Sequence, residues 1–368
     1  MIERVAIIGL GLIGGSMGMA LLQGQVAREV VGYDRETRAL ETGLEVGAIS
    51  RVAGSAPEAV EDAKLVILAV PVGSLPAVAR EIAPHLSAEA VITDTGSTKG
   101  RLVTVLEDIF GSRGHYIGGH PMTGSERAGI AAADRYLLEN AVYLLTPTAR
   151  TDRAALHWLE RILQALGARV LCLSPEDHDR IVGAVSHLPH LLAVALMQLA
   201  AELSGRHPQL LMLAAGGFRD TTRIAGGNPV MWRDIYLSNA ETILEMVELF
   251  QRELQRLAEL IKAGNERSLE QVLHSARNSR IQIPARQKGL LPNLHEIVIT
   301  VPDKPGVIGY VGQMLGQEGI NISDIEILRV REGEGGTIRL GFTSASAAEQ
   351  ALNVLRQHGV TARWRDSG

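Results

Sequence analysis

Short apolar runs and longer amphipathic stretches alternate along the first half of the chain. After two N-terminal runs that end at Ile8 and Asp34, further runs occupy residues 65–70, 90–95, 141–146 and 169–174. Strand-length apolar runs separated by helix-length segments are typical of β-strands that alternate with α-helices. We therefore expect an α/β fold of the Rossmann type, with a mainly parallel, doubly wound sheet.

Helical periodicity takes over after residue 173. Ser174, Pro175 and Asp177 have the order of a helix start. Ser186 and His190 follow, four residues apart on one predicted helix face. Pro189 must bend this helix or begin a new segment because it lacks a backbone N–H. The pattern predicts an all-helical domain, and His190 is either part of a site or a core histidine.

A glycine-rich loop is expected near residues 214–228, where two Gly-Gly pairs bracket Arg219 and Arg223. A heptad seam comes next, at Tyr236, Ala240, Ile243, Val247, Phe250, Leu254, Leu257 and Ile261. Such a seam needs a partner helix, either in this chain or in a second subunit. We favour a homodimer.

The tail changes pattern again, after a linker at residues 288–294. It predicts a βαββαβ module, with strands at 295–301, 320–330, 337–343 and 360–365, one helix at 307–319 and a second from a capping box, Ser346 to Glu349. Such a module binds small effectors or pairs with itself. The expected domain boundaries are therefore 1–173 for the α/β part, 174–288 for the helical part and 294–368 for the βαββαβ module.

Composition narrows the class of protein. The 368 residues are 46% hydrophobic and carry a net charge of −5, so neither nucleic acid nor an anionic membrane surface is an expected partner. A single cysteine, Cys172, excludes an internal disulfide and a cysteine metal cluster. The N-terminal run does not suit a signal peptide, and the apolar run at 191–201 is too short to span a bilayer and predicts a buried helix. We expect a cytoplasmic protein with no metal.

A phosphate-binding loop follows the first strand. Gly9, Gly11 and Gly14 have the GxGxxG spacing around Leu12 and Ile13, and Asp34 ends the second strand twenty residues later. The glycines would permit the turn and the approach of a pyrophosphate to a helix N-terminus. Asp34 would accept hydrogen bonds from ribose hydroxyls and disfavour a 2′-phosphate, so NAD is the expected cofactor. Arg35 beside it leaves some use of NADP open.

The stretch GGHPMTGSERAG, residues 118–129, contains the candidate base. We expect its glycines and proline to hold His120 at a turn. Ser97 follows the strand at 90–95, and ligands of such sheets bind beyond the carboxyl ends of the strands. Ser97 and His120 are therefore expected to meet near the nicotinamide end of the cofactor.

Taken together, these motifs resemble the prephenate dehydrogenase family with an appended ACT domain, over nearly the whole chain. The likeness rests on GLGLIGGS, DTGSTKG, GGHPMTGSE, SHLPH and GGFRDTTRIA followed by MWRDI. The resemblance implies NAD-dependent oxidation of prephenate, with loss of carbon dioxide, to 4-hydroxyphenylpyruvate on the way to tyrosine.

The resemblance also implies residue roles. His120 becomes the catalytic base and Ser97 its hydroxyl partner, Ser186 and His190 line the pocket, Arg223 clamps a substrate carboxylate and Glu126 gates the pocket mouth. In the ACT domain, Pro305, Gly306 and Asn321 become candidate residues for an L-tyrosine effector.

Three alternatives remain at this point. Arogenate could replace prephenate as substrate. A 3-hydroxyacid dehydrogenase would need a lysine from the second domain, but no lysine occurs between Lys99 and Lys262. A regulatory protein that binds NAD and an amino acid without turnover would not need the histidine, serine and arginine set.

Overall fold

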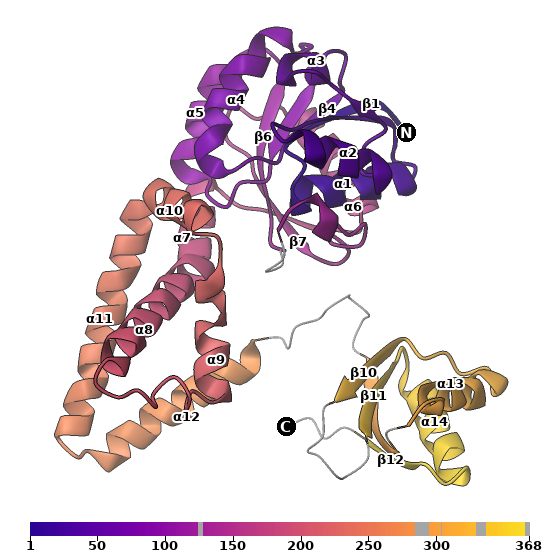
Figure 1. Cartoon of the computed structure of the whole chain (residues 1–368), viewed down its shortest axis with the longest axis vertical. Coiled ribbons are helices and arrows are strands. Elements are labelled where there is room, and N and C mark those ends of the chain that lie inside the picture. The colour runs from indigo at the N-terminus through magenta and orange to yellow at the C-terminus, as the bar shows by residue number, and fades with distance from the viewer. Residues whose placement is uncertain (124–127, 284–293, 303, 329–335, 365–368) are drawn as a thin grey trace. The chain divides into compact units, whose positions relative to one another are not determined.

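The computed structural model describes residues 1–123, 128–283, 294–302, 304–328 and 336–364. The chain divides into two compact units, Met1–Gln282 and Ile283–Gly368. Figure 1 shows the sheet and helical parts of the first unit in indigo to orange and the second unit in yellow. Each unit is described by itself.

The first unit contains an eight-stranded sheet in the order β3-β2-β1-β4-β5-β6-β7-β8. The strands are β1 (Ile2–Ile8), β2 (Ala27–Tyr33), β3 (Arg51–Val52), β4 (Leu65–Leu68), β5 (Val91–Asp94), β6 (His115–Pro121), β7 (Val142–Thr146) and β8 (Arg169–Cys172). All neighbours are parallel except β6 and β7. The order reverses between β1 and β4, which is where such sheets bind ligands. The predicted fold class is confirmed.

Helices cover both faces of this sheet, because alternate strand residues are apolar on each side. One core packs α1 (Leu12–Gln23) and α6 (Arg153–Ala165) against residues such as Val5, Ile7 and Ile67. The other packs α3 (Ala56–Val60), α4 (Leu75–Ile82) and α5 (Gly100–Phe110) against Ile8, Val66 and Ile92. A further helix, α2 (Thr37–Glu45), follows β2.

The turn predicted around His120 is wrong, because residues 118–121 are the end of strand β6. The glycines serve close packing instead of a turn. A β-carbon at Gly119 would lie 2.6 Å from the carbonyl oxygen of Asp94, and one at Gly118 would lie 2.4 Å from Oγ1 of Thr146. Any larger residue would push β6 away from its neighbours.

The helical part begins with α7 (Pro175–Val182), whose predicted start is confirmed: the hydroxyl of Ser174 accepts a hydrogen bond from the N–H of Asp177. A π-helical turn, Gly183–His187, separates α7 from α8 (Leu188–Ser204). Pro189 lies in the first turn of α8, directly after the π-helical turn, so its missing N–H falls where the regular i→i−4 pattern is already interrupted. The sequence predicts a bend or a new segment here, whereas the helical stretch Pro175–Ser204 is continuous, with the π-helical turn as its irregularity.

The loop predicted near residues 214–228 is largely helical. It forms α9 (Gly216–Thr222) and the 3₁₀ turn η5 (Arg223–Gly226), before α10 (Pro229–Ser238). The Asn228 side chain accepts hydrogen bonds from the N–H groups of Val230 and Met231 and so starts α10.

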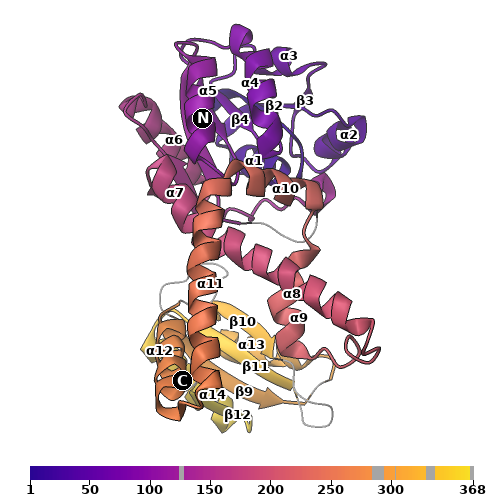
Figure 2. The same cartoon turned by 90° about the vertical axis from the view of Figure 1, so that its left-hand side faces the viewer.

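The heptad seam is shorter than predicted. Asn239 separates α10 from α11 (Ala240–Lys262), and α12 (Glu266–Gln282) follows, so Tyr236 does not lie on the long helix. Figure 2 shows α11 as one long rod with α8 crossing it. Its seam residues Phe250, Leu254 and Ile261 are exposed within the described chain.

The expectation of a buried helix at 191–201 is also wrong for one chain. Leu199 is exposed, and α8 buries only His190, Ala193 and Ala200 among its residues. By length and composition, the continuous helical stretch Pro175–Ser204 would suffice to cross a membrane. The described residues of the chain therefore cover little of the apolar surface of α8.

The second unit has a four-stranded antiparallel sheet in the order β10-β11-β9-β12, with two helices over a single apolar core. Its elements are β9 (His295–Val301), α13 (Val307–Gln317), β10 (Asp324–Leu328), β11 (Gly336–Phe342), α14 (Ala345–Gln357) and β12 (Thr361–Trp364). The βαββαβ order is confirmed. The predicted cap of the last helix is not, since Ser344, not Ser346, accepts the hydrogen bond from the N–H of Ala347.

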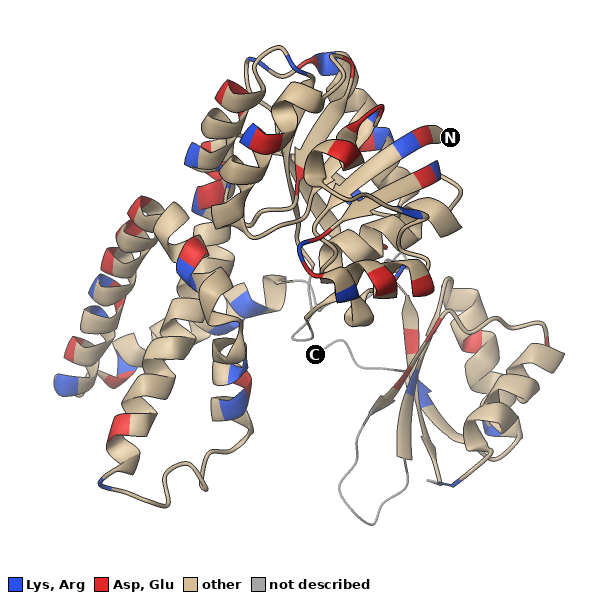
Figure 3. Ribbon diagram, turned by 45° about the horizontal axis from the view of Figure 1, so that its top comes forward, with Lys and Arg blue, Asp and Glu red and all other residues tan. Residues whose placement is uncertain are grey.

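The positions of Lys and Arg (blue) and of Asp and Glu (red) are interspersed along the ribbon in Figure 3. In the second unit, for example, Arg339 on β11 pairs with Glu296, Asp324 and Glu326. On α11, Arg256 pairs with Glu253. Lysine and arginine therefore do not collect on one helix or strand surface of the described residues.

Candidate functional site

The glycine-rich loop between β1 and α1 has the geometry of a phosphate site. Gly9 has φ +98°, which favours glycine, and a β-carbon there would lie 2.5 Å from the carbonyl oxygen of Ala69. A β-carbon at Gly14 would lie 2.0 Å from the oxygen of Gly9, whereas one at Gly11 would meet nothing within 4 Å. The loop is thus closed toward the protein and open at Gly11, the start of α1.

The end of β2 completes this site. Oδ2 of Asp34 accepts a hydrogen bond from the N–H of Leu10 at 2.7 Å, and Oδ1 accepts one from Glu36 at 2.9 Å. The carboxylate is therefore fixed beside the loop. Leu12 and Ile13 form the first turn of α1, where free N–H groups favour an anion. These residues fit a dinucleotide with an unphosphorylated ribose.

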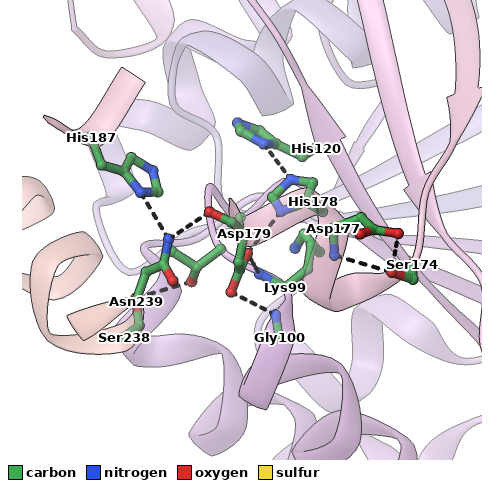
Figure 4. Close-up of polar contacts among 12 residues, drawn as sticks. Lys99, Gly100, His120, Ser174, Asp177, His178, Asp179, His187, Ser238 and Asn239 are labelled. Atoms are coloured by element: carbon green, nitrogen blue, oxygen red, sulfur yellow. Dashed lines mark hydrogen bonds and ion pairs between the residues drawn. The ribbon is translucent and has the colours of Figure 1, made fainter. Parts of the chain in front are cut away.

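A chain of hydrogen bonds runs from His120 into the helical part of the first unit (Figure 4). Nδ1 of His120 lies 2.9 Å from Nε2 of His178, and Nδ1 of His178 lies 2.8 Å from Oδ1 of Asp179. The Asp179 carboxylate also accepts the N–H groups of Lys99 at 2.6 Å and Gly100 at 2.7 Å. One chain of contacts therefore joins β6, α7 and the start of α5.

A buried ion pair lies under the same site. Lys99 Nζ pairs with the carboxylate of Asp94, and both side chains are fully buried. The Asp94 carboxylate also accepts the N–H of Gly96 at 2.8 Å, the hydroxyl of Tyr116 at 2.8 Å and the N–H of Gly119 at 3.2 Å. It ties β5 to β6, and so holds the strand that carries His120.

These surroundings keep the histidines neutral. Burial, followed by the charges of His178, Lys99 and His187, lowers the pKa of His120 well below its ordinary value. Burial also lowers the pKa of His178, although the hydrogen bond to Asp179 opposes that effect. A neutral imidazole buried to 8% exposure can accept a proton at pH 7.

Two further histidines from the helical part lie buried around Trp232. Nδ1 of His190 lies 2.6 Å from the hydroxyl of Tyr236, and its ring stacks on Trp232 with centroids 3.5 Å apart. Nδ1 of His187 accepts a hydrogen bond from Asn239 at 3.2 Å, and burial lowers its pKa to about 4. Nε2 of His187 is buried and makes no hydrogen bond to any residue that the structure describes.

Comparison with known proteins gives the family. Residues 17–172 match the family described as prephenate dehydrogenase, nucleotide-binding domain; residues 174–275 match prephenate dehydrogenase, dimerization domain; and residues 295–359 match the ACT domain. A prephenate dehydrogenase of Bacillus subtilis (strain 168) is 36% identical over 97% of both chains. The chain belongs to the prephenate dehydrogenase family.

Other relatives agree with this assignment. A prephenate dehydrogenase of Lactococcus lactis subsp. cremoris (strain MG1363) is 34% identical over 96% of this chain and 98% of its own length. The crystal structure of the Aquifex aeolicus prephenate dehydrogenase, in complex with hydroxyphenyl propionate and NAD+, has a TM-score of 0.74 and 36% identity, over 77% of this chain and 99% of that one. The family, the enzyme class, the reaction and the NAD cofactor inferred from the sequence are confirmed.

The predicted site residues are only partly drawn together. His120 lies at the end of β6 and Ser97 follows the neighbouring β5, but no hydrogen bond joins them among the described residues. Ser186 lies in the π-helical turn and is half-buried, and the exposed Arg223 lies in η5, which packs against α8. Glu126 lies outside the described residues.

In the second unit, Pro305 and Gly306 form the exposed turn before α13, and Asn321 is exposed just before β10. No group of three or more His, Cys, Asp or Glu side chains in the described part of the chain is arranged to hold a metal ion.

Sequence reasoning missed six residues whose contacts organise the candidate site of this chain. They are Asp94, Lys99, His178, Asp179, His187 and Asn239. His187 lies inside the SHLPH motif, and Asp94 opens the DTGSTKG motif, so both could have been singled out. His178 and Asp179 had no local signal, because their partners are 58 and 80 residues away.

Proposed function

We propose that His120 is the base with which this chain oxidises prephenate, and that the substrate binds between the carboxyl end of the sheet and the histidines of the helical part. The observation that carries the proposal is the buried, neutral His120 at the end of β6, with Nδ1 engaged by His178. The ring therefore has Nε2 left for a substrate hydroxyl.

The chemistry divides between the cofactor and the chain. NAD, held by the loop between β1 and α1 and by Asp34, would supply the hydride acceptor for the carbon that carries the substrate hydroxyl. His120 takes the hydroxyl proton, so that the oxygen can form a carbonyl as the hydride leaves. The ring carboxylate departs as carbon dioxide, its bonding electrons make the ring aromatic, and the resulting phenolate takes the proton back from His120. Ser97 supports the same oxygen as a hydroxyl donor.

The substrate's carboxylates and hydroxyl need donors, and the helical part offers them. We assign Arg223 to a carboxylate, because its planar guanidinium matches carboxylate geometry, and Ser186, His190 and Glu126 to the pocket wall. Asn239 donates to Nδ1 of His187, so neutral His187 carries its proton on the buried Nε2, which makes no hydrogen bond to any described residue. That N–H is a further donor for a substrate oxygen.

We also propose the assembly. The domains remain 1–173, 174–288 and 294–368, and two copies pair through the helical domain, which matches a dimerization domain and exposes Phe250, Leu254 and Ile261 on α11. We expect the homodimer to be cytoplasmic. L-tyrosine is the proposed effector of the ACT domain, at Pro305, Gly306 and Asn321.

The test is an assay of the purified chain with prephenate and with arogenate, each with NAD and NADP. NADH absorbance should rise with prephenate and NAD. If only arogenate is turned over, arogenate and not prephenate is the substrate. If NAD binds but neither compound is turned over, the chain is a sensor and not an enzyme.

Replacing Arg223 by alanine should raise KM for prephenate about 10–100-fold, equivalent to the loss of about 1.5–3 kcal/mol from a charged hydrogen bond. The Kd of NAD should stay unchanged. Arg223→Lys is the matched control, and it should recover only part of the affinity because an ammonium lacks the planar fork. Weakened NAD binding in Arg223→Ala would remove the arginine from the substrate pocket.

A further inference from the structure

His120 is not an isolated ring. Its Nδ1 lies at one end of a buried chain of three side chains. The chain runs from His120 through His178 to Asp179, with contacts of 2.9 and 2.8 Å. His178 is fully buried, and Asp179 is 5% exposed. Figure 4 shows that the three side chains follow one another from the strand into the helix.

The far end of this chain can only accept hydrogen bonds. The Asp179 carboxylate receives the N–H groups of Lys99 and Gly100, at the unsatisfied N-terminus of α5, as well as Nδ1 of His178. A carboxylate in this position is stabilised by the positive end of the α5 dipole. His178 must therefore carry its proton on Nδ1 and present a bare Nε2.

The tautomer of His178 determines that of His120. A bare Nε2 on His178 accepts a hydrogen bond, so Nδ1 of His120 must be the donor at 2.9 Å. A neutral imidazole with its proton on Nδ1 has its lone pair on Nε2.

We propose that His178 and Asp179 are positioning residues that fix His120 as the tautomer with its lone pair on Nε2, the form needed to take the substrate's proton. This inference rests on the proposed role of His120. Without the chain, both tautomers of His120 are available, and only one of them is a base toward the substrate.

The charged and titratable groups around the chain agree with this arrangement. His120 faces His178, Lys99 and His187, and burial is the largest cause of its lowered pKa. His178 faces Asp179, Lys99 and Asp94, and its pKa is also lowered. Both rings are therefore neutral, the state in which the tautomer matters.

The test is Asp179→Asn. Oδ1 of Asp179 serves Lys99 and His178, whereas Oδ2 serves Gly100. An asparagine has a single acceptor oxygen. With that oxygen on the Gly100 N–H, its amide donates to Nδ1 of His178, which moves the proton of His178 onto Nε2 and that of His120 onto Nε2. We expect kcat to fall about 10–100-fold, with the KM values for prephenate and NAD within twofold of wild type.

Two further variants keep the test decisive. His178→Gln can still reach His120 but loses Asp179, and it should show a similar fall in kcat if Asp179→Asn does not fold. Ser174→Ala removes the cap of α7 and leaves the chain of contacts intact. It should lower the melting temperature but leave kcat unchanged, which separates positioning from a merely loosened helix.

Nitrogen-15 NMR of labelled histidine reads the tautomer directly, with the His120 signal assigned by its absence in His120→Asn. In the wild-type protein the proton should lie on Nδ1 of His120, and in Asp179→Asn on Nε2. A wild-type proton on Nε2, or an Asp179→Asn kcat within twofold of wild type, overturns the proposal.

The proposed function has a different test, since it is wrong if His120→Asn retains full turnover. In that case the NMR measurement on the wild-type protein still determines the tautomer of His120.

Discussion

At the residue scale, His120 must be neutral to act as a base, and its surroundings make it so over an unusually wide range. Its pKa lies well below 6.5, chiefly because burial disfavours the charged ring. The neutral form therefore persists as the pH falls through 6.5, and is lost only when the pH falls through the lowered pKa.

We predict that kcat/KM of the wild-type enzyme stays level as the pH falls through 6.5, with its acid limb below that value. In His120→Asn, turnover should fall about 10²–10⁴-fold and lose the acid limb, while NAD and prephenate still bind. Steady-state rates from NADH absorbance and calorimetric Kd values measure the two effects. Near-normal turnover in the variant would remove His120 from its role.

Asp34 is the residue that we expect to set the choice of cofactor. Replacing it by alanine removes an acceptor for the ribose and the hydrogen bond from Leu10. NAD should bind more weakly, and its margin over NADP should narrow because a negative charge near the 2′-position is gone. Arg35→Ala, at the exposed neighbour, is the control and should widen the margin. If the ratio does not move in Asp34→Ala, another residue sets the choice.

The sequence identifies site residues that belong to a short motif, and it does not identify those whose contacts form only in the folded chain. Gly9, Gly14 and Asp34 lie within one βαβ unit, and the structure gives each the backbone or hydrogen bonds that the motif requires. His178 and Asp179 look like ordinary residues of a short helix, because their partners are distant in the chain. A contact between β6 and α7 leaves no periodic trace in either segment.

At the scale of elements, the glycines before His120 show why one residue type admits two interpretations. Glycine permits a turn, but it also permits close approach of two strands, and only the second applies at Gly118 and Gly119. The prediction of a loop near residues 214–228 is wrong for a related reason. Its Gly-Gly pairs suggested turns, whereas the cap at Asn228 and the contacts with α8 stabilise helices.

We predict that Gly119→Ala destabilises the first unit by about 1–3 kcal/mol, the usual cost of overpacking. Its β-carbon would lie 2.6 Å from the oxygen of Asp94 and would displace β6. Thermal melting should report the loss, and kcat should fall as His120 moves. Gly216→Ala, where a β-carbon meets nothing within 4 Å, should leave the melting temperature within about a degree. Equal stability of the two variants would show that β6 does not need its glycine.

At the scale of the whole molecule, the sequence contains apolar positions on two helices that the described residues of one chain do not bury. The seam on α11 and the face of α8 both remain exposed within the described residues. Large exposed apolar surfaces mark interaction sites, and these two surfaces therefore support the proposed dimer. The proposed dimer gives both faces a partner, and sedimentation of the purified protein should show twice the mass of the chain.

The ACT domain gives the same molecule a proposed means of control. Gly306 has φ +92° and precedes α13, whose first N–H groups receive no side-chain cap from any residue that the structure describes and can hold a carboxylate. Asn321 lies in the segment that leads to β10. L-tyrosine bound there would lower activity by favouring a less competent arrangement of the dimer, whereas tyrosine that competes with substrate would act at the site of His120.

We predict that Asn321→Ala in the full-length protein weakens inhibition by tyrosine while kcat and KM without tyrosine stay unchanged. Asn353→Ala, at an exposed asparagine on α14, is the matched control and should be inhibited as the wild type is. A chain cut after Leu291 separates the two sites of action: it should stay active, keep its KM for prephenate and lose inhibition altogether. If the shortened enzyme is inhibited by tyrosine with unchanged potency, the tyrosine acts in the dehydrogenase site and regulation through the ACT domain is wrong.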